Sequence, residues 1–194
     1  MLNFEVLCLN DTIKPVQTLE SLTARLRDTS TRRDAFPVLV KQYQQRIYNV
    51  VRKMVISHDD ADDIVQDVFV KVWNNLDNFK GEAKLFTWMY RIATNESLQF
   101  LRRKRNQSWF KTDITEELAN VLVSEKYMDG DEVQLKLQKA ILQLPDKQRL
   151  VFNLKYFEDL TYDEIADITD STVGSLKASF HHATKKIEEF LQQH

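Results

Sequence analysis

The stretch TWMYRIATNESLQFLRRKRN, residues 87–106, combines aromatic rings, amides and cations at helical spacing. Five of its side chains recur at steps of three and four and are expected to share one helix face: Trp88, Arg91, Asn95, Gln99 and Arg102. Arginines and amides read base edges, rings stack on unpaired bases, and cations neutralise phosphate. This chemistry predicts a helix that holds opened DNA. The alternative is a packed helix with Trp88 in the core, which is the ordinary place for a tryptophan.

Four adjacent cations end the same stretch: Arg102, Arg103, Lys104 and Arg105. A basic helix end suits the helix dipole, but four cations exceed what the dipole needs, and they repel one another. We therefore expect a polyanion near them. At the other end, Thr87 precedes the first expected helical residue and is predicted to cap the helix.

The helix expected over about residues 60–77 carries a broad apolar stripe and a separate, mainly acidic seam. The seam consists of Asp63, Gln66, Asp67, Val70 and Asn74. A charged helix face is usually only solvated. An exposed valine within an acidic seam nevertheless indicates a protein partner with basic side chains. Ser57 or Asp59 is expected to cap this helix.

Near the C-terminal end, the spacing predicts a short helix, a tight turn and a longer helix. Thr161 and Glu164 have the spacing of a capping box, and the short helix is expected to run to about Thr169. Asp170 tolerates the left-handed backbone that a tight turn needs. Thr172 is expected to cap the longer helix, which runs to about residue 191.

That longer helix divides into two faces. Val173, Leu176 and Phe180 have core spacing, whereas Lys177, His181 and Lys185 lie on another face. A short helix, a turn and a longer helix with a cationic face predict a helix-turn-helix whose second helix enters the major groove of DNA. An ordinary helical hairpin with a solvated Lys/His face is the alternative. Adjacent His181 and His182 are poor metal ligands, since they lie on different faces.

The composition favours helices and excludes several classes of protein. Only three glycines and three prolines occur in 194 residues, and a single cysteine supports neither an internal disulfide nor a metal cluster. We find no phosphate-binding glycine loop, no nucleophile–base pair and no metal spacing, so we expect no enzyme and no cofactor. No apolar run has the length of a membrane span. The composition fits a reducing, cytoplasmic compartment.

The net charge of −2 conceals strong segregation. Residues 55–79 contain six Asp and one Lys, residues 80–111 contain eight Lys/Arg and two Glu, and residues 112–133 contain seven acids and one Lys. Because local charge sets the field that a phosphate meets, near-neutrality does not exclude a nucleic-acid partner.

The expected fold class is all-α, with two small helical domains joined by a flexible linker. The predicted boundaries are 34–106 for the first domain, 107–132 for an acidic linker and 133–194 for the helix-turn-helix domain. Residues 1–33 stay unassigned, although LESLTARLR at 19–27 has helical character.

Two runs of this sequence resemble a known family. DDADDIVQDVFVKVWNNLDNFKGEAKLFTWMYRIATN resembles region 2 of bacterial RNA polymerase sigma factors, and LQLPDKQRLVFNLKYFEDLTYDEIADITDSTVGSLKASFHHATKKI resembles their region 4. Two such regions without a region 3 resemble the extracytoplasmic-function (ECF) group of the sigma-70 family. The resemblance implies a chain that binds core RNA polymerase, at the clamp helices of the largest subunit and the flap region, and promoter DNA. An anti-sigma factor is a further candidate partner.

The resemblance also implies roles for single residues. It assigns polymerase binding to the seam residues Asp63, Gln66, Asp67, Val70 and Asn74. It assigns capture of a flipped base to the loop Phe79–Ala83 and to Asn95. Opening of the minus-ten element falls on Phe79, Lys80, Trp88, Arg91, Asn95, Gln99, Arg102, Arg103 and Arg105. Recognition of the minus-thirty-five element falls on Tyr162, Thr172, Lys177, Ala178, His181, His182 and Lys185.

The sequence departs from the family at several positions. Gln99 stands where an Asp is usual, and Asp170 replaces the usual turn glycine. Ser179, His182 and Thr184 replace basic residues, which predicts a weaker hold on duplex DNA. The rival interpretation is a stand-alone helix-turn-helix regulator in which residues 34–106 sense a signal or form a dimer.

Overall fold

The computed structural model describes residues 19–79, 84–107, 118–122 and 132–193, and the regular structure within these ranges is helical. The all-α prediction is therefore confirmed. In chain order the elements are α1 (Leu19–Arg27), α2 (Arg32–Val55), α3 (His58–Asn74), the 3-10 turn η1 (Leu76–Asn78), α4 (Leu85–Gln107), α6 (Glu132–Leu142), α7 (Asp146–Tyr156), α8 (Tyr162–Thr169) and α9 (Val173–Gln193).

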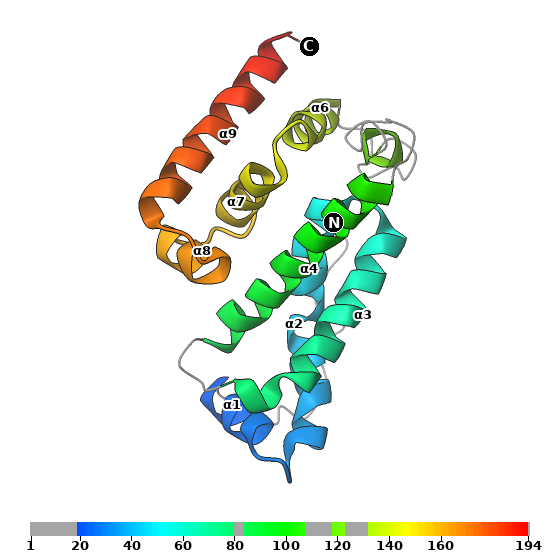
Figure 1. Ribbon diagram of the computed structural model, residues 1–194, viewed down its shortest axis with the longest axis vertical. Coiled ribbons are helices and arrows are strands. Elements are labelled where there is room, and N and C mark those ends of the chain that lie inside the picture. The colour runs from blue at the N-terminus through cyan, green and yellow to red at the C-terminus, as the bar shows by residue number, and fades with distance from the viewer. Residues whose placement is uncertain (1–18, 80–83, 108–117, 123–131, 194) are drawn as a thin grey trace, which may run out of the picture.

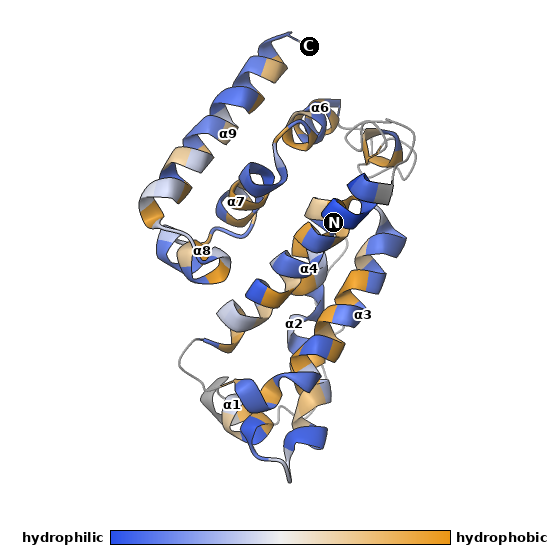
Figure 2. Cartoon of the chain, in the orientation of Figure 1, coloured by the Kyte–Doolittle hydropathy of each residue, from blue (hydrophilic) through white to orange (hydrophobic). Residues whose placement is uncertain are grey.

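The first half is built from α2, α3 and α4, each of which packs against the other two. Apolar side chains at steps of three and four give each helix one buried face, as the alternating colours along α3 and α4 in Figure 2 show. Helix α1, in the part of the chain that sequence analysis left unassigned, packs on α2 and buries Leu22 and Leu26. The packed first half thus begins before residue 34.

The ends of α3 and α4 test two capping predictions. The Ser57 side chain accepts a hydrogen bond from the Asp60 backbone N–H at 3.3 Å, so the Ser57 cap is confirmed. The Thr87 cap is wrong, because α4 begins two residues earlier, at Leu85. Thr87 lies within the first turn and is only 4% exposed, so packing rather than capping decides its place.

The second half confirms the predicted helix-turn-helix geometry. The Thr161 hydroxyl accepts from the Glu164 N–H at 3.2 Å, and the Glu164 carboxylate accepts from the Thr161 N–H at 3.0 Å. The Thr161 N–H and the Thr161 hydroxyl, which both donate to the Glu164 carboxylate, hold the pKa of Glu164 below its usual value. Asp170 adopts the left-handed conformation, with φ 53° and ψ 48°. The Thr172 hydroxyl caps α9 by accepting from the Ser175 N–H at 3.3 Å.

The two halves, whose relative placement the sequence left open, pack side by side (Figure 1). Helix α8 lies against α4, and α7 lies against α2. One cluster of buried apolar side chains runs through both halves, and α7 contributes Leu150, Val151 and Leu154 to it. Helix α9 lies on the outer side, against α6, α7 and α8.

The predicted linker, 107–132, falls mostly outside the described residues. Within it, residues 118–122 are helical, and both Leu118 and Leu122 are 1% exposed. Its first and last residues belong to α4 and α6.

Candidate polymerase and nucleic-acid interfaces

The acidic seam of α3 lies on the solvent side of that helix. The acidic first turn of α3 suits the helix dipole, and Ile64, Val68 and Val72 turn the opposite face into the core. The polar seam residues are all exposed: Asp63, Gln66, Asp67 and Asn74. Val70 is 57% exposed, an unusual place for a valine. The predicted separate surface is therefore present.

The ion pairs that tie α3 to α4 use residues outside the seam. Lys71 pairs with Glu96 at 2.5 Å, and Lys104 pairs with Asp60 at 3.3 Å. These pairs fix α3 on α4 and leave the seam acids on the outward face.

The face of α4 that was predicted to hold opened DNA has an exposed and a packed part. The exposed residues are Arg91, Asn95, Gln99, Arg102, Arg103 and Arg105, and Trp88 is half-buried. Phe79 is only 4% exposed, and its ring lies 5.0 Å from the Trp88 ring, centroid to centroid. Phe79 thus joins the core and does not present a ring to DNA in this structure. Lys80 and the rest of the predicted base-capturing loop, residues 80–83, lie outside the described residues.

Helix α8 contacts this same face of α4. The Arg91 Nε donates a hydrogen bond to the Asp167 backbone oxygen at 3.1 Å, and the Arg91 Nη2 donates to the same atom. A small cavity of about 100 Å³ lies between the halves, lined by Asn95 and its neighbours on α4 and by α7 and the α8–α9 turn. The second half therefore covers part of the surface predicted to open DNA.

A polar cluster around Glu158 joins the halves behind this contact. The Glu158 carboxylate accepts from Lys53 Nζ at 3.2 Å and from the Tyr90 hydroxyl at 3.0 Å, and the Glu158 side chain is 11% exposed. Burial, and next the Glu158 charge, raise the pKa of the Tyr90 hydroxyl far above its usual value. The Asn153 amide donates to the Lys53 backbone oxygen at 3.2 Å. Both halves contribute a charge to this cluster.

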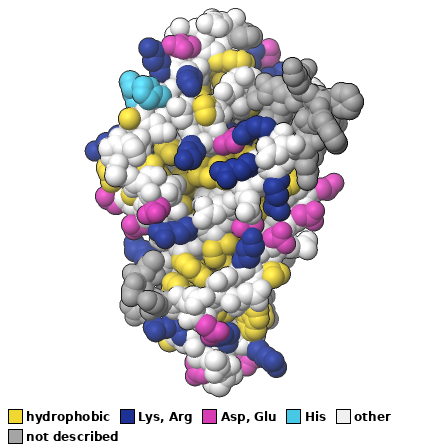
Figure 3. Space-filling model, in the orientation of Figure 1, with side chains coloured by type: hydrophobic (Ala, Val, Ile, Leu, Met, Phe, Trp, Pro, Cys, Tyr) yellow, Lys and Arg dark blue, Asp and Glu magenta, His cyan; other side chains and the backbone are white. Residues whose placement is uncertain are grey.

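Two cations at the basic end of α4 form ion pairs with carboxylates of the same chain. Lys104 pairs with Asp60, and Arg105 pairs with Asp146 of α7 at 2.8 Å. Asp146 also pairs with Arg149 at 3.2 Å, and burial lowers the pKa of Arg149. The prediction that these cations need a polyanion is corrected for Lys104 and Arg105, because carboxylates distant in sequence supply the counter-charge. Figure 3 shows Lys and Arg side chains across the middle of this face, with acids beside them.

The predicted groove face of α9 is exposed. All the residues predicted to bind the upstream element here are exposed: Thr172 before α9, and Lys177, Ala178, His181, His182 and Lys185 on it. On the other side, Leu176 is buried, while Val173 and Phe180 are half-buried. The Lys177 Nζ lies 5.8 Å from the centroid of the half-buried Tyr162 ring. This contact holds a cation beside the turn of the helix-turn-helix.

Known proteins match both halves of the chain. Residues 39–107 match the Sigma-70 region 2 family, and residues 134–187 match the Sigma-70 region 4 family. The ECF RNA polymerase sigma factor SigW of Bacillus subtilis (strain 168) is 31% identical over 168 residues, which are 82% of this chain and 90% of SigW. The chain belongs to the ECF group of the sigma-70 family. The ECF RNA polymerase sigma-E factor of Escherichia coli (strain K12) is also 31% identical, over 81% of this chain and 87% of the relative.

Solved structures share the fold of this sigma factor. CnrH, in complex with the cytosolic domain of CnrY, superposes with a TM-score of 0.64 at 24% identity, covering 89% of this chain and 96% of CnrH. The sigma factor RpoE from Bartonella quintana, in complex with the anti-sigma factor NepR, gives a TM-score of 0.62 at 20% identity, covering 81% of this chain and 96% of RpoE.

Membership of the family settles the biochemical role. The chain is a sigma factor that binds core RNA polymerase and directs promoter recognition and transcription initiation. Among the described helices, none combines the length and the hydropathy that a membrane crossing needs.

Sequence reasoning missed the contacts between the halves. Lys53 and Glu158 are 105 residues apart, and Arg91 and Asp167 are 76 apart. No local spacing signals such pairs. A weak signal was available for Glu158, an acid placed between two aromatic stretches near the end of α7.

Proposed function

We propose that the two faces of the first half divide the work of initiation. The α3 seam docks on the clamp helices of the polymerase largest subunit, through Asp63, Gln66, Asp67, Val70 and Asn74. The α4 face opens the minus-ten element, and α9 reads the minus-thirty-five element in the major groove. The observation that supports this proposal most directly is that Val70 is exposed among exposed acids, on a helix face that no described element covers.

The packed arrangement of the halves supports a closed free form. Arg91 donates to the backbone of α8, and the exposed Asn95 lines a cavity that α7 and the α8–α9 turn also border. Separation of the halves frees Arg91 and widens the space beside Asn95 for a flipped base. Promoter opening by this chain therefore requires the halves to separate, and polymerase docking on α3 is compatible with the closed form.

Regulation by an anti-sigma factor fits this closed form. CnrH and the Bartonella quintana RpoE were both solved with partner proteins. A partner that holds the two halves together keeps the α4 face covered. We place the action of this chain in the cytoplasm and assign it no catalytic step of its own, since base pairing and phosphodiester chemistry belong to polymerase and DNA.

Transcription in vitro tests the proposal. Core polymerase from a bacterium that uses this factor is supplied with promoter DNA, with and without the chain. Promoter-specific transcripts are expected only with the chain, and permanganate should detect unpaired thymines in the minus-ten element. Duplex binding in the absence of polymerase, together with no gain in transcripts, would favour the stand-alone regulator.

A further inference from the structure

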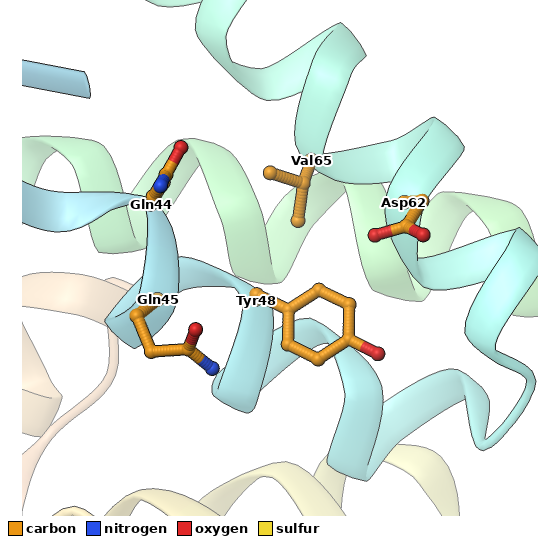
Figure 4. Close-up of a pocket in the computed structure, with 5 residues that line it drawn as sticks. All are labelled: Gln44, Gln45, Tyr48, Asp62 and Val65. Atoms are coloured by element: carbon orange, nitrogen blue, oxygen red, sulfur yellow. The ribbon is translucent and has the colours of Figure 1, made fainter. Parts of the chain in front are cut away.

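A pocket opens between α2 and α3, away from the contact of the two halves. Its volume is about 290 Å³, and it is lined by Gln44, Gln45 and Tyr48 of α2 and by Asp62 and Val65 of α3 (Figure 4). This volume has room for one long side chain of a partner.

The lining has the chemistry of a guanidinium site. Asp62 supplies an exposed carboxylate, and the described lining residues include no Lys or Arg. The Tyr48 ring lies between the amides of α2 and Asp62 (Figure 4), and its hydroxyl is held by His58 Nδ1. The Tyr48 and His58 rings stack, with centroids 6.2 Å apart and planes at 19°. A fixed aromatic face next to a carboxylate suits arginine better than lysine, because a planar guanidinium stacks and bonds a carboxylate through two N–H groups.

The glutamine side chains add hydrogen-bond acceptors for a guanidinium group. The Gln45 Nε2 donates to Asn49 Oδ1 at 3.0 Å, which turns the Gln45 nitrogen toward its own helix. The Gln45 carbonyl oxygen is then available as an acceptor at the rim. A guanidinium group has five N–H donors, and amide oxygens can accept hydrogen bonds from those that a single carboxylate does not engage.

The pocket adjoins the α3 seam. Asp62 lies four residues before Gln66 of the seam, so the two side chains are neighbours on the surface of α3. A partner that covers the seam therefore also reaches the pocket rim. DNA is a poor occupant, because Asp62 repels phosphate.

We propose that this pocket receives an arginine side chain of core RNA polymerase and so extends the α3 docking surface onto α2. The inference rests on the proposed function of the seam. It adds Gln44, Gln45, Tyr48 and Asp62 to the contact and names the chemistry of the polymerase residue that they recognise.

Binding of the full-length chain to core polymerase, measured by fluorescence anisotropy, tests the pocket. Asp62→Asn removes the charge and keeps the shape, and we expect binding to weaken about tenfold. Asp34→Asn is the matched control, since it removes the same charge from an exposed site about 15 Å along α2 from Gln44. If Asp62→Asn binds polymerase as well as the control does, while the double variant Asp63→Arg with Asp67→Arg fails to bind, the pocket proposal is overturned. The proposed role of the seam is then retained. If none of these variants binds polymerase more weakly than the natural chain, the pocket proposal and the proposed role of the seam are both overturned.

A crosslink identifies the occupant. Gln45 is exposed and is replaced by the photoreactive amino acid benzoylphenylalanine in the full chain. We expect a crosslink to polymerase beside an arginine, and alanine at that arginine should abolish the effect of Asp62→Asn. A crosslink with no arginine nearby, additive effects of the two substitutions, or no crosslink to polymerase would each overturn the proposal.

Discussion

Helices α3 and α4 each carry one polar face at helical spacing, and the fold treats the two faces differently. The α3 seam is exposed along its whole length, from Asp63 to Asn74. The α4 face meets α8 at Arg91 and borders a small cavity at Asn95. The surface proposed for polymerase docking is therefore fully exposed, whereas part of the surface proposed for DNA opening is in contact with the second half.

We propose that this difference orders the events of initiation. Polymerase docks on α3 without disturbing the closed form, and DNA has access to the whole α4 face once α8 has moved away from Arg91. The contacts between the halves combine apolar packing with polar groups, such as Glu158 with Lys53 and Tyr90. Polar contacts of this kind are common in interfaces between domains that move relative to one another.

The largest expected effect concerns Phe79, which the resemblance placed on the DNA side. Because Phe79 is 4% exposed and packs on Trp88, Phe79→Ala should lower the free energy of unfolding by about 4 kcal/mol. Thermal or urea unfolding followed by circular dichroism measures this loss. If the variant is as stable as the natural chain, Phe79 does not belong to the core and lies on the surface that faces DNA. The contrast between the α3 and α4 faces would then be weaker.

Charge reversal in the seam tests the accessible face. Asp63→Arg with Asp67→Arg places two cations opposite a basic partner, so core binding should weaken by about 2.8 kcal/mol, a hundredfold. Both sites are exposed, so the fold should be retained. Asp34→Arg, on α2, is the control in the same assay. Equal affinity of a folded double variant and the natural chain would remove the seam from the docking surface.

Asn95→Ala tests the covered face without disturbing the core, because Asn95 is exposed. Loss of an amide from the base pocket should disfavour strand opening by about 2 kcal/mol, since unpairing a base costs a few kcal/mol that pocket contacts offset. Permanganate reactivity of minus-ten thymines should fall, while duplex binding at the upstream element is unchanged. Normal opening would show that α4 is a packed helix with a basic end.

Glu158→Gln should loosen the closed form. Glutamine keeps one acceptor oxygen but loses the charge that holds Lys53, a loss of about 1.5 kcal/mol for a hydrogen bond to a charged group. The free chain should then bind duplex promoter DNA more tightly than the natural chain in gel shifts. Asp34→Asn, at an exposed site on α2 away from the proposed DNA-binding helices, serves as the control. If both variants bind DNA like the natural chain, the closed form does not limit DNA access.

The smallest effects are expected on α9. Lys177→Ala and His181→Ala should each cost about 1 kcal/mol at one position of the upstream element, because each removes a single groove contact. Binding to a series of single-base variants of that element measures the loss. A uniform loss across all sequences would assign these side chains to phosphate rather than to bases.

Local chemistry was predictable from the sequence, and contacts between distant segments were not. Ser57, Thr161 and Asp170 each act within four residues along the chain, so their caps and turn could be predicted. The Thr87 prediction failed because burial of Leu85 and Thr87 extends α4 backwards. The pairing of Arg105 with Asp146 depends on how the halves pack, and helix spacing holds no information about that.

The central claim is that the halves are closed in the free chain and separate on polymerase. Spin labels on cysteines at Asn106 of α4 and Glu188 of α9, both exposed, measure it directly by double electron–electron resonance, with the single natural Cys8 changed to Ser. We predict one narrow distance distribution in the free chain and a clear shift to longer distances with core polymerase. A distribution that is the same with and without polymerase, while promoter DNA opens, would contradict the account.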